Sequence, residues 1–421
     1  MSISTIDQAH IWHPLTQHKT SSAPIPIVRA KGAVLYAEDG ATYIDGIASW
    51  YTAMYGHCHP YIIEQVTAQM QTLDQIVFTG FTHQPATTLA QKVLAILPDN
   101  QQKIFFNDNG STAVEAGIKM ALQYHHNKGD QRNTLIAFED GFHGDTFGAM
   151  SVSGLSVYNG PFEDYFLKVQ RIPTPTEDNI EEVLHLLKTI IDTHPCAGFI
   201  YEPLVQGAAG MQMHDAAGLE AILTFCKTHD IITIADEVMT GFGKTGKHFA
   251  SLHLETYPDI ICLSKSLTAG LLPMSLTTCT QEIYDAFLDD TVSKGFFHAH
   301  TYSANPIACA AAIAGIDLLT SEEIQHQIQH IQERHTAFAK AIKTHPKALN
   351  IRVKGVIFAL ELNTEMERYG SLRNQLFKHF MDRGVALRPL GNTIYILPPF
   401  VINDEQLDTI YTAIEEALNT F

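Results

Sequence analysis

The stretch that decides the fold runs from Ile231 to Lys265, and it contains two apolar segments that each lead to a charged residue. The first, Ile231-Ile232-Thr233-Ile234-Ala235, runs directly into Asp236, and the second, Ile260-Ile261-Cys262-Leu263, is followed two residues later by Lys265. Short apolar runs rich in β-branched residues are typical of buried strands. We therefore expect a carboxylate and an amine just beyond the ends of two strands, where open α/β sheets bind ligands.

Lys265 and Asp236 together suit one cofactor, pyridoxal phosphate. A lysine held in an apolar site can lose its proton and attack a carbonyl carbon. An aspartate can hold a protonated ring nitrogen by charge pairing, and pyridoxal phosphate carries both groups. The alternative is that Lys265 is an ordinary surface lysine. The apolar strand before it and its small neighbours, Ser264 and Ser266, argue against that alternative.

The composition is that of an ordinary globular protein, with 45% apolar and 17% charged residues among 421, a length that predicts two or three domains. The net charge of −18 argues against nucleic acid and membrane surfaces as partners. The six cysteines are scattered, which predicts reduced thiols and a cytoplasmic location. We expect neither a signal peptide nor a membrane-spanning segment.

Strand-like and helical segments alternate along most of the chain, which indicates a mostly parallel sheet covered by helices, an α/β fold. The last 75 or so residues have an α+β pattern instead. We predict an N-terminal segment (1–60) that contributes to a small domain, a large cofactor-binding domain (61–318), and a C-terminal small α+β domain (319–421). The expected strands are a hairpin over 33–45 and segments 103–107, 134–138, 196–201, 231–236, 259–264, 274–279 and 351–362, with two more near 385–397. The expected helices are 61–74, 84–97, 112–126, 217–229, 306–345, 371–383 and 404–418.

Two loops that follow expected strands could contact a cofactor. Gly110 and Ser111 open a helix, where free N–H groups bind phosphate, although an ordinary helix cap is the commoner explanation of such a sequence. Phe142, in Asp140-Gly141-Phe142-His143-Gly144, could stack on a planar ring or could be a core residue in a glycine-rich turn.

A third loop imitates a nucleotide-binding motif. Gly241, Gly243 and Gly246 satisfy GxGxxG, but a P-loop would need glycine at Val238, and no helix is expected to begin here. We interpret these glycines as a flexible loop over a site.

Histidine pairs separated by one residue occur at His57 and His59 and at His298 and His300. Neither pair has a carboxylate or CxxC partner nearby in the sequence, so we expect no metal site.

Trp50 and Tyr51 are flanked by Ser49, Thr52 and Gly56, which suggests a loop that lines a pocket. Arg388 lies between two apolar strands, and it is either part of a structural ion pair or a clamp for a carboxylate ligand.

These residues carry a resemblance to a known family. The segments that begin at Asp236 and at Ser264 resemble the class III pyridoxal-phosphate aminotransferases of fold type I, over nearly the whole chain. Within that class, further segments resemble the branch that aminates 8-amino-7-oxononanoate in biotin synthesis. These segments are Ile11-Trp12-His13-Pro14, Ser49-Trp50, Gly110-Ser111, His143 to Ser151, Glu202-Pro203, Asn305-Pro306 and Arg388-Pro389.

The resemblance implies a fold and a set of roles. The fold would have a large domain with a mostly parallel seven-stranded sheet and a smaller α+β domain. The protein would form a homodimer with a shared active site. Lys265, Asp236 and Phe142 would be catalytic. The phosphate would be held by Gly110 and Ser111 together with Thr301 of the other subunit, and the ring would lie between Phe142 and Val238. Arg388 would bind the carboxylate of the acceptor, and the substrate would also meet Trp50, Tyr51, Lys244 and Lys265.

The implied reaction converts 8-amino-7-oxononanoate into 7,8-diaminononanoate. Four positions depart from the family pattern: Leu15 and Phe142 commonly carry tyrosine, Tyr51 tryptophan and Lys244 arginine. The hydroxyls missing at Leu15 and Phe142 are each worth roughly 0.5–1.5 kcal/mol in hydrogen bonds. The amino donor is therefore open between S-adenosylmethionine and lysine or another amine.

Three other functions compete with this one. The nearest is another class III ω-aminotransferase, acting on ornithine, 4-aminobutyrate or a similar amine, against which Trp12 and Trp50 weigh. A nucleotide-dependent oxidoreductase would use the glycines of residues 241–246. A non-catalytic relative would have no need of Lys265 and Asp236.

Overall fold

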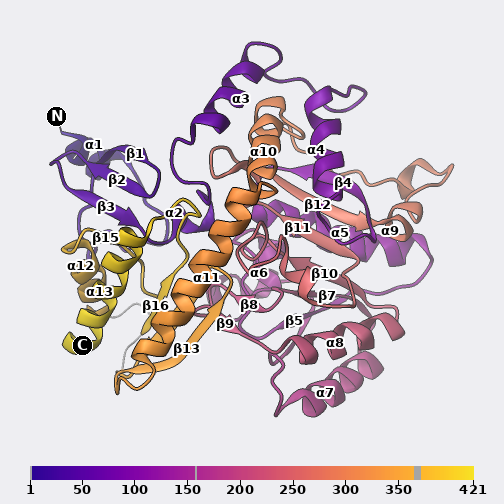
Figure 1. Cartoon of the computed structure of the whole chain (residues 1–421). Helices are drawn as coiled ribbons and strands as arrows, with labels where there is room; N and C mark the ends of the chain where they lie inside the picture. The colour runs from indigo at the N-terminus through magenta and orange to yellow at the C-terminus, as the bar shows by residue number, and fades with distance from the viewer. Residues whose placement is uncertain (1, 157–158, 365–370) are drawn as a thin grey trace.

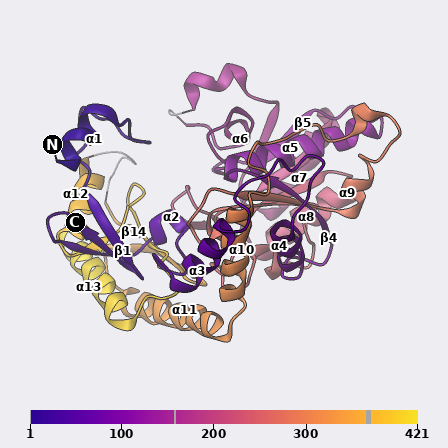
Figure 2. The same ribbon diagram turned by 90° about the horizontal axis from the view of Figure 1, so that it is seen from above.

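The computed structural model describes residues 2–156, 159–364 and 371–421 of the chain. Its large part is built on a central sheet, and a smaller part lies to one side of it (Figure 1). Both chain termini belong to the smaller part, and α2 lies between the two parts in both views (Figures 1 and 2).

The central sheet has seven strands in the order β4-β12-β11-β10-β7-β5-β6. β12 pairs antiparallel with both of its neighbours, whereas the pairs on the β11 to β6 side are parallel. The expected mostly parallel sheet is therefore confirmed. Its strands are β4 (Gln101–Asn107), β5 (Thr134–Phe138), β6 (Val169–Ile172), β7 (Cys196–Tyr201), β10 (Ile232–Asp236), β11 (Ile260–Leu263) and β12 (Ser275–Thr280).

Helices cover both faces of this sheet, which is why its inner strands β5, β7, β10 and β11 are mostly continuous apolar runs rather than alternating with polar residues. Ile234 and Cys262 pack in the cluster that includes the apolar residues of α5, and Ala235 and Ile261 pack in the cluster that includes those of α8. The helices are α1 (Ile3–His10), α2 (Ala48–Tyr51), α3 (Pro60–Met70), α4 (Gln84–Leu94), α5 (Gly110–Asn127), α6 (Phe147–Ser151), α7 (Ile180–Thr193), α8 (Ala216–Thr228), α9 (Gln281–Asp285), α10 (Pro306–Leu319), α11 (Glu322–Ile342), α12 (Ser371–Met381) and α13 (Asp404–Thr420). Short 3-10 segments are η1 (Gly160–Tyr165), η2 (Ala250–His253), η3 (Lys265–Thr268) and η4 (Val292–Lys294).

The smaller part contains two further sheets. In one, β1 (Ile27–Lys31), β2 (Val34–Ala37) and β3 (Thr42–Asp45) form a meander that β15 (Val385–Ala386) extends. The other contains β13 (Ala348–Lys354), β14 (Ile357–Leu362) and β16 (Thr393–Ile396), and a separate ribbon joins β8 (Val205–Gln206) to β9 (Gln212–Met213). The expected hairpin over 33–45 is confirmed, and β15 brings the two ends of the chain into one sheet. The domain boundaries at residues 60 and 318 stay a prediction.

Two expected elements are wrong in the same way, because each is divided by a turn. The segment 351–362 is a hairpin, β13 and β14, that turns at Gly355, where φ is +57° and an added Cβ would lie 2.3 Å from the nitrogen of Gly246. The segment 306–345 is two helices, because the hydroxyl of Ser321 caps α11 by accepting from the N–H of Ile324.

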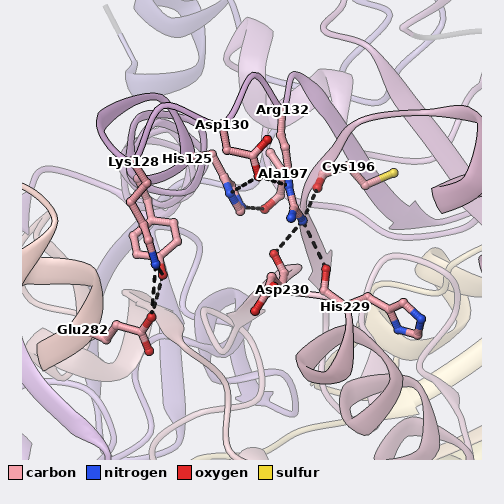
Figure 3. A network of polar contacts seen from close by, with 10 residues as sticks. His125, Lys128, Asp130, Arg132, Cys196, Ala197, His229, Asp230 and Glu282 are labelled. Carbon is pink, nitrogen blue, oxygen red and sulfur yellow. Dashed lines mark hydrogen bonds and ion pairs between the residues drawn. The ribbon is translucent and has the colours of Figure 1, made fainter.

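Arg132 fastens the sheet at the edge where β5, β7 and β10 begin (Figure 3). Its guanidinium donates to the carbonyls of Cys196, His229 and Asp230 at 3.3, 3.2 and 2.8 Å, and it pairs with Asp130 at 2.6 Å. The same strands end at the opposite edge of the sheet, where Asp236 lies. None of the described helices is long and apolar enough to cross a membrane.

Candidate active site

Asp236 and Lys265 lie at the same edge of the central sheet. β10 ends at Asp236, which pairs in parallel with Cys262 of β11, and Lys265 follows Cys262 by three residues. Lys265 has a φ of +50°, a left-handed conformation that residues other than glycine rarely adopt. Such strain is concentrated at functional sites, where the surrounding structure maintains it.

Asp236 is held by a histidine that we did not select from the sequence. Its Oδ2 lies 2.7 Å from Nδ1 of His143, and its Oδ1 accepts from the N–H of Val238 at 3.1 Å. Both Asp236 and His143 are buried. This pair fixes the carboxylate at the strand end and provides a charge that could face a ring nitrogen.

The amine of Lys265 is shifted toward its neutral form. Burial lowers its pKa below the ordinary value of 10.5, although the carboxylates of Asp236 and Glu202 act in the opposite direction. Its Nζ lies 5.0 Å from the centre of the Tyr51 ring. A lysine with a lowered pKa can act as a nucleophile and as a base.

Glu202 is a second buried carboxyl at this site, and the sequence pointed to it only as part of a family motif. Its Oε2 accepts from the N–H of Phe142 and its Oε1 from the N–H of Gly207, both at 3.0 Å. Burial raises its pKa to about 7, and the charge of Asp236 acts in the same direction while His143 opposes it. Glu202 thus ties the Phe142 loop to the segment that follows β7.

The start of α5 offers an anion site. Asn109 caps the helix by accepting from the N–H of Thr112, and within the described parts of the chain the N–H groups of Gly110 and Ser111 have no acceptor. A long helix concentrates positive potential at this end. Ser111 is positioned by the next loop, because its Oγ accepts from the N–H of Asp145 at 3.3 Å.

Phe142 and Val238 flank this region. Phe142 is 45% exposed, so it is accessible to a ligand. Val238 packs against Gly110 so closely that a Cβ on Gly110 would lie 2.9 Å from Cγ1 of Val238. Their placement on opposite faces of a cofactor ring stays a prediction.

A left-handed turn carries the two aromatic residues expected to meet the substrate. Ala48, Ser49, Trp50 and Tyr51 all have φ between +46° and +71°. The guanidinium of Arg388 lies 5.3 Å from the centre of the Trp50 ring. The hydroxyl of Tyr51 donates to the hydroxyl of Tyr395 at 3.0 Å, and its carbonyl accepts from Oγ of Ser266 at 2.9 Å, beside Lys265. The structure thus brings Trp50, Tyr51, Lys265 and Arg388 together.

The loop 240–246 is not the flexible loop that we expected. Residues 240–245 are buried, and an added Cβ on Gly243 would meet Ile328, Leu319 and Phe400 within 3.1 Å. Lys244 is fully buried, and its Nζ donates to the carbonyl of Gly241 at 2.9 Å. Burial and the nearby Lys265 lower its pKa well below the ordinary value. The only helical element close behind is the short η2, so the dinucleotide interpretation lacks its helix.

The remaining predicted residues lie outside this cluster. Thr301 is exposed, and its carbonyl accepts from Gln75 at 3.0 Å. His57 pairs with Asp45, whereas His298 lies 3.1 Å from His300. Among residues 2–156, 159–364 and 371–421, no group of three or more His, Cys, Asp or Glu side chains is placed to hold a metal ion.

The donor set therefore suits one kind of ligand. It offers N–H groups for an anion at the start of α5, a buried carboxylate for a ring nitrogen, and an amine for an electrophilic carbon. The chemistry of these groups fits pyridoxal phosphate.

Comparison with known proteins gives the class to which the chain belongs. The family model described as aminotransferase class-III matches residues 15–418. The chain therefore belongs to the class III aminotransferases, and the expected fold type I is confirmed by its structural neighbours.

Individual relatives are more specific. The chain is 40% identical to the adenosylmethionine-8-amino-7-oxononanoate aminotransferase of Synechococcus elongatus, covering 97% of this chain and 98% of the relative. It is 37% identical to the same enzyme of Geobacter sulfurreducens, over 98% and 96% of the two chains. The crystal structure of that enzyme from Methanocaldococcus jannaschii superposes with a TM-score of 0.92 at 32% identity, over 98% of each chain. A PLP-bound amine transaminase from an uncultivated Pseudomonas species gives 0.91 at 27% identity, over 97% and 98%.

Proposed function

We propose that the protein is a pyridoxal-phosphate-dependent aminotransferase that converts 8-amino-7-oxononanoate into 7,8-diaminononanoate in biotin synthesis. The observation that carries this proposal is the placement of Asp236 and Lys265 just past paired strand ends, with the ring of Tyr51 close to the amine of Lys265 and the guanidinium of Arg388 close to the ring of Trp50. The relatives of Synechococcus elongatus and Geobacter sulfurreducens, aligned over nearly the whole chain, support the choice of substrate.

Six residues would hold the cofactor. Asp236, held by His143, would keep a proton on the ring nitrogen, and Lys265 would bind the aldehyde carbon. The N–H groups of Gly110 and Ser111 would donate to the phosphate, and Phe142 and Val238 would pack on the ring. When bound, pyridoxal phosphate supplies a ring that accepts the electron pair left on a carbon when its proton is removed.

Lys265 would move the proton in both halves of the reaction. With the donor bound, its neutral Nζ would take the proton from the carbon that carries the amino group. With the acceptor bound, the same nitrogen would return a proton to C7 of the product. The lowered pKa of Lys265 favours the neutral form that the first step requires.

Arg388 and the turn 48–51 would bind the acceptor. The guanidinium fork of Arg388 suits the carboxylate of 8-amino-7-oxononanoate, and its charge is exposed at this point. Trp50 and Tyr51 would line the aliphatic chain between that carboxylate and the reacting carbon.

We propose further that the protein works as a cytoplasmic homodimer in which Thr301 of each subunit reaches the phosphate of the other. The exposure of Thr301 supports this assignment, because its side chain is free to meet a second subunit. The six free cysteines support a reducing compartment.

The donor is the open part of the proposal. Leu15 is 59% exposed, and neither it nor Phe142 offers a hydroxyl to a polar donor. We therefore expect weak use of S-adenosylmethionine and better use of lysine or another amine. Another ω-aminotransferase activity, on ornithine or 4-aminobutyrate, is the second candidate.

The test is a donor screen with 8-amino-7-oxononanoate as acceptor. Purified protein should be yellow, and each amine should bleach that colour in proportion to its use as a donor. Product should form only when the acceptor is added, and Lys265→Ala should neither turn over nor bleach. Full activity in Lys265→Ala would end the proposal, and efficient bleaching by S-adenosylmethionine alone would overturn the assignment of the donor.

A further inference from the structure

A buried carboxylate outside the cofactor site is hydrogen-bonded to the segment that enters the turn of Trp50 and Tyr51. Asp45 is the last residue of β3 and is 1% exposed. Its Oδ1 accepts from the N–H of Ile47 at 3.2 Å, and its Oδ2 accepts from Oγ of Ser49 at 3.0 Å. Both donors belong to the segment that enters the left-handed turn.

His57 completes this cluster from the far side of the turn. Its Nε2 lies 2.8 Å from Oδ2 of Asp45, and because a carboxylate only accepts hydrogen bonds, Nε2 carries the proton. The backbone of His57 exchanges two hydrogen bonds with Gly32, at 2.8 and 3.0 Å, so it is anchored to the β1–β2 connection. Asp45, Ser49 and His57 form what we name the Asp45 cluster.

The turn needs such a support, because its conformation is unfavourable. Four consecutive residues other than glycine, Ala48 to Tyr51, have positive φ. Without tertiary support, these residues would favour right-handed or extended conformations. The Asp45 cluster bonds the turn at Ile47 and Ser49 and connects it to His57 beyond the turn.

The same strand end also positions Arg388. β3 pairs in parallel with β15, with Asp45 opposite Ala386, and Gly46 donates to the carbonyl of Ala386 at 3.2 Å. Arg388 follows two residues later. Asp45 therefore lies at the point from which the aromatic turn and the arginine both enter the site.

The cluster is not a hydrolytic Ser-His-Asp triad. In a triad the histidine uses one nitrogen for the carboxylate and the other for the serine. Here Nε2 of His57 and Oγ of Ser49 both bond to the same oxygen of Asp45, so the histidine cannot take a proton from the serine while it holds the carboxylate.

We propose that Asp45, with His57 and Ser49, is a positioning residue that fixes Trp50 and Arg388 for the acceptor carboxylate. This inference rests on the proposed function only for the identity of the acceptor. The control of the turn itself follows from the contacts of Asp45. It predicts that loss of the cluster weakens the binding of the acceptor and leaves the chemistry at Lys265 intact.

The first experiment reports on the turn without any substrate. The chain has two tryptophans, so a Trp12→Phe background leaves Trp50 as the only tryptophan, which is excited selectively at the red edge of the absorption band. In that background the holoenzyme and its Ser49→Ala, His57→Ala and Asp45→Asn variants are compared by acrylamide quenching and fluorescence anisotropy. We expect at least a twofold higher quenching constant and a lower anisotropy in each variant, with unchanged absorbance of the bound cofactor.

Two further variants distinguish positioning from general damage. In His57→Gln the amide nitrogen can replace Nε2 as donor, so this variant should restore the quenching constant that His57→Ala raises. Asp259→Asn is the matched control, because Asp259 also bonds a backbone N–H and a hydroxyl, both of Thr233, at the opposite end of β10. It should leave the emission of Trp50 unchanged.

The second experiment measures the two half-reactions separately. In Asp45→Asn and His57→Ala we expect the KM for the acceptor to rise at least tenfold while the rate of bleaching by the donor stays within twofold. Unchanged quenching and unchanged KM would overturn the inference, and so would an equal loss in both half-reactions. If the acceptor is not a substrate even for the unaltered enzyme, the proposed function fails while the fluorescence result still decides the role of Asp45. If Asp45→Asn does not fold, Ser49→Ala and the two His57 variants decide it.

Discussion

Glu202 gives the most direct test of the electrostatics of the site, through the replacement Glu202→Gln. Glu202 is 4% exposed and has a pKa of about 7, whereas an exposed carboxyl has 4.5. Between these values the folded state keeps a proton that the unfolded state has released. Stability therefore falls as the pH rises from 4.5 to 7 and is constant above that range, as far as this group is concerned.

The size of the effect follows from the two pKa values. One pKa unit corresponds to about 1.4 kcal/mol. Between pH 5 and pH 8 the free energy of unfolding of the wild-type protein should therefore fall by about 2.5 kcal/mol relative to that of Glu202→Gln. Glutamine cannot ionise, but its amide nitrogen faces one of the two backbone N–H groups. The free energy of unfolding of the variant should therefore also be lower by about 1–3 kcal/mol at every pH. The variant should be clearly less stable than wild type at pH 5 and about equal to it at pH 8.

The assay is urea unfolding of the apoprotein, followed by tryptophan emission and circular dichroism at pH 5, 6, 7 and 8. Glu220→Gln is the matched control, because Glu220 also accepts from two backbone N–H groups, those of Glu255 and Thr256, at a half-buried position away from the site. For each variant the difference in the free energy of unfolding from wild type is compared across the pH series. If this difference depended on pH in the same way for Glu202→Gln and Glu220→Gln, the explanation by a buried charge would be refuted.

Three further replacements test other parts of the structure. Gly144→Ala should weaken binding of the cofactor by about tenfold or more in a spectroscopic titration, because φ is +129° at Gly144 and the added Cβ would lie 2.1 Å from Oγ of Ser111. Arg388→Leu should raise the KM for the acceptor by about 10- to 100-fold and leave the yellow colour unchanged, since charge-assisted hydrogen bonds are lost only to the carboxylate. Arg132→Met should lower the free energy of unfolding by about 2 kcal/mol with an unchanged cofactor spectrum, because it frees three carbonyls at the sheet edge opposite the site.

Much of the large part of the fold could be predicted from the sequence, because its strands are buried on both faces. Such strands are continuous apolar runs, and the expected segments 134–138 and 196–201 coincide with β5 and β7. The segment between them gave no prediction, although it contains β6 and α7. β6 is an edge strand with the sequence Val-Gln-Arg-Ile, and its half-buried polar residues hide the apolar pattern.

From the sequence, the predictable parts of the site were single reactive residues at or just past the end of an apolar strand. Asp236 and Lys265 have that property, and the register of β10 and β11 brings them together. The partners of Asp236 and Phe142, which are His143 and Glu202, belong to loops after other strands, and no local spacing connects them. Loop 240–246 shows that a local pattern can also mislead. Its glycines permit close packing against α10 and α11, and the GxGxxG pattern does not reveal this tertiary packing.

The two ends of the proposed substrate site are built differently, and this bears on the question of the donor. The acceptor end comes from β3, β15 and the turn 48–51, and Ser266 fastens that turn beside Lys265 through the carbonyl of Tyr51. A change there would disturb the left-handed turn that carries Trp50 and Tyr51. Leu15, in contrast, is exposed in the N-terminal segment, where a side chain can change without moving the sheet. We therefore expect the acceptor to be the fixed substrate of this protein and the donor to be the variable one. A Leu15→Tyr, Phe142→Tyr double variant should gain use of S-adenosylmethionine while its KM for the acceptor stays unchanged.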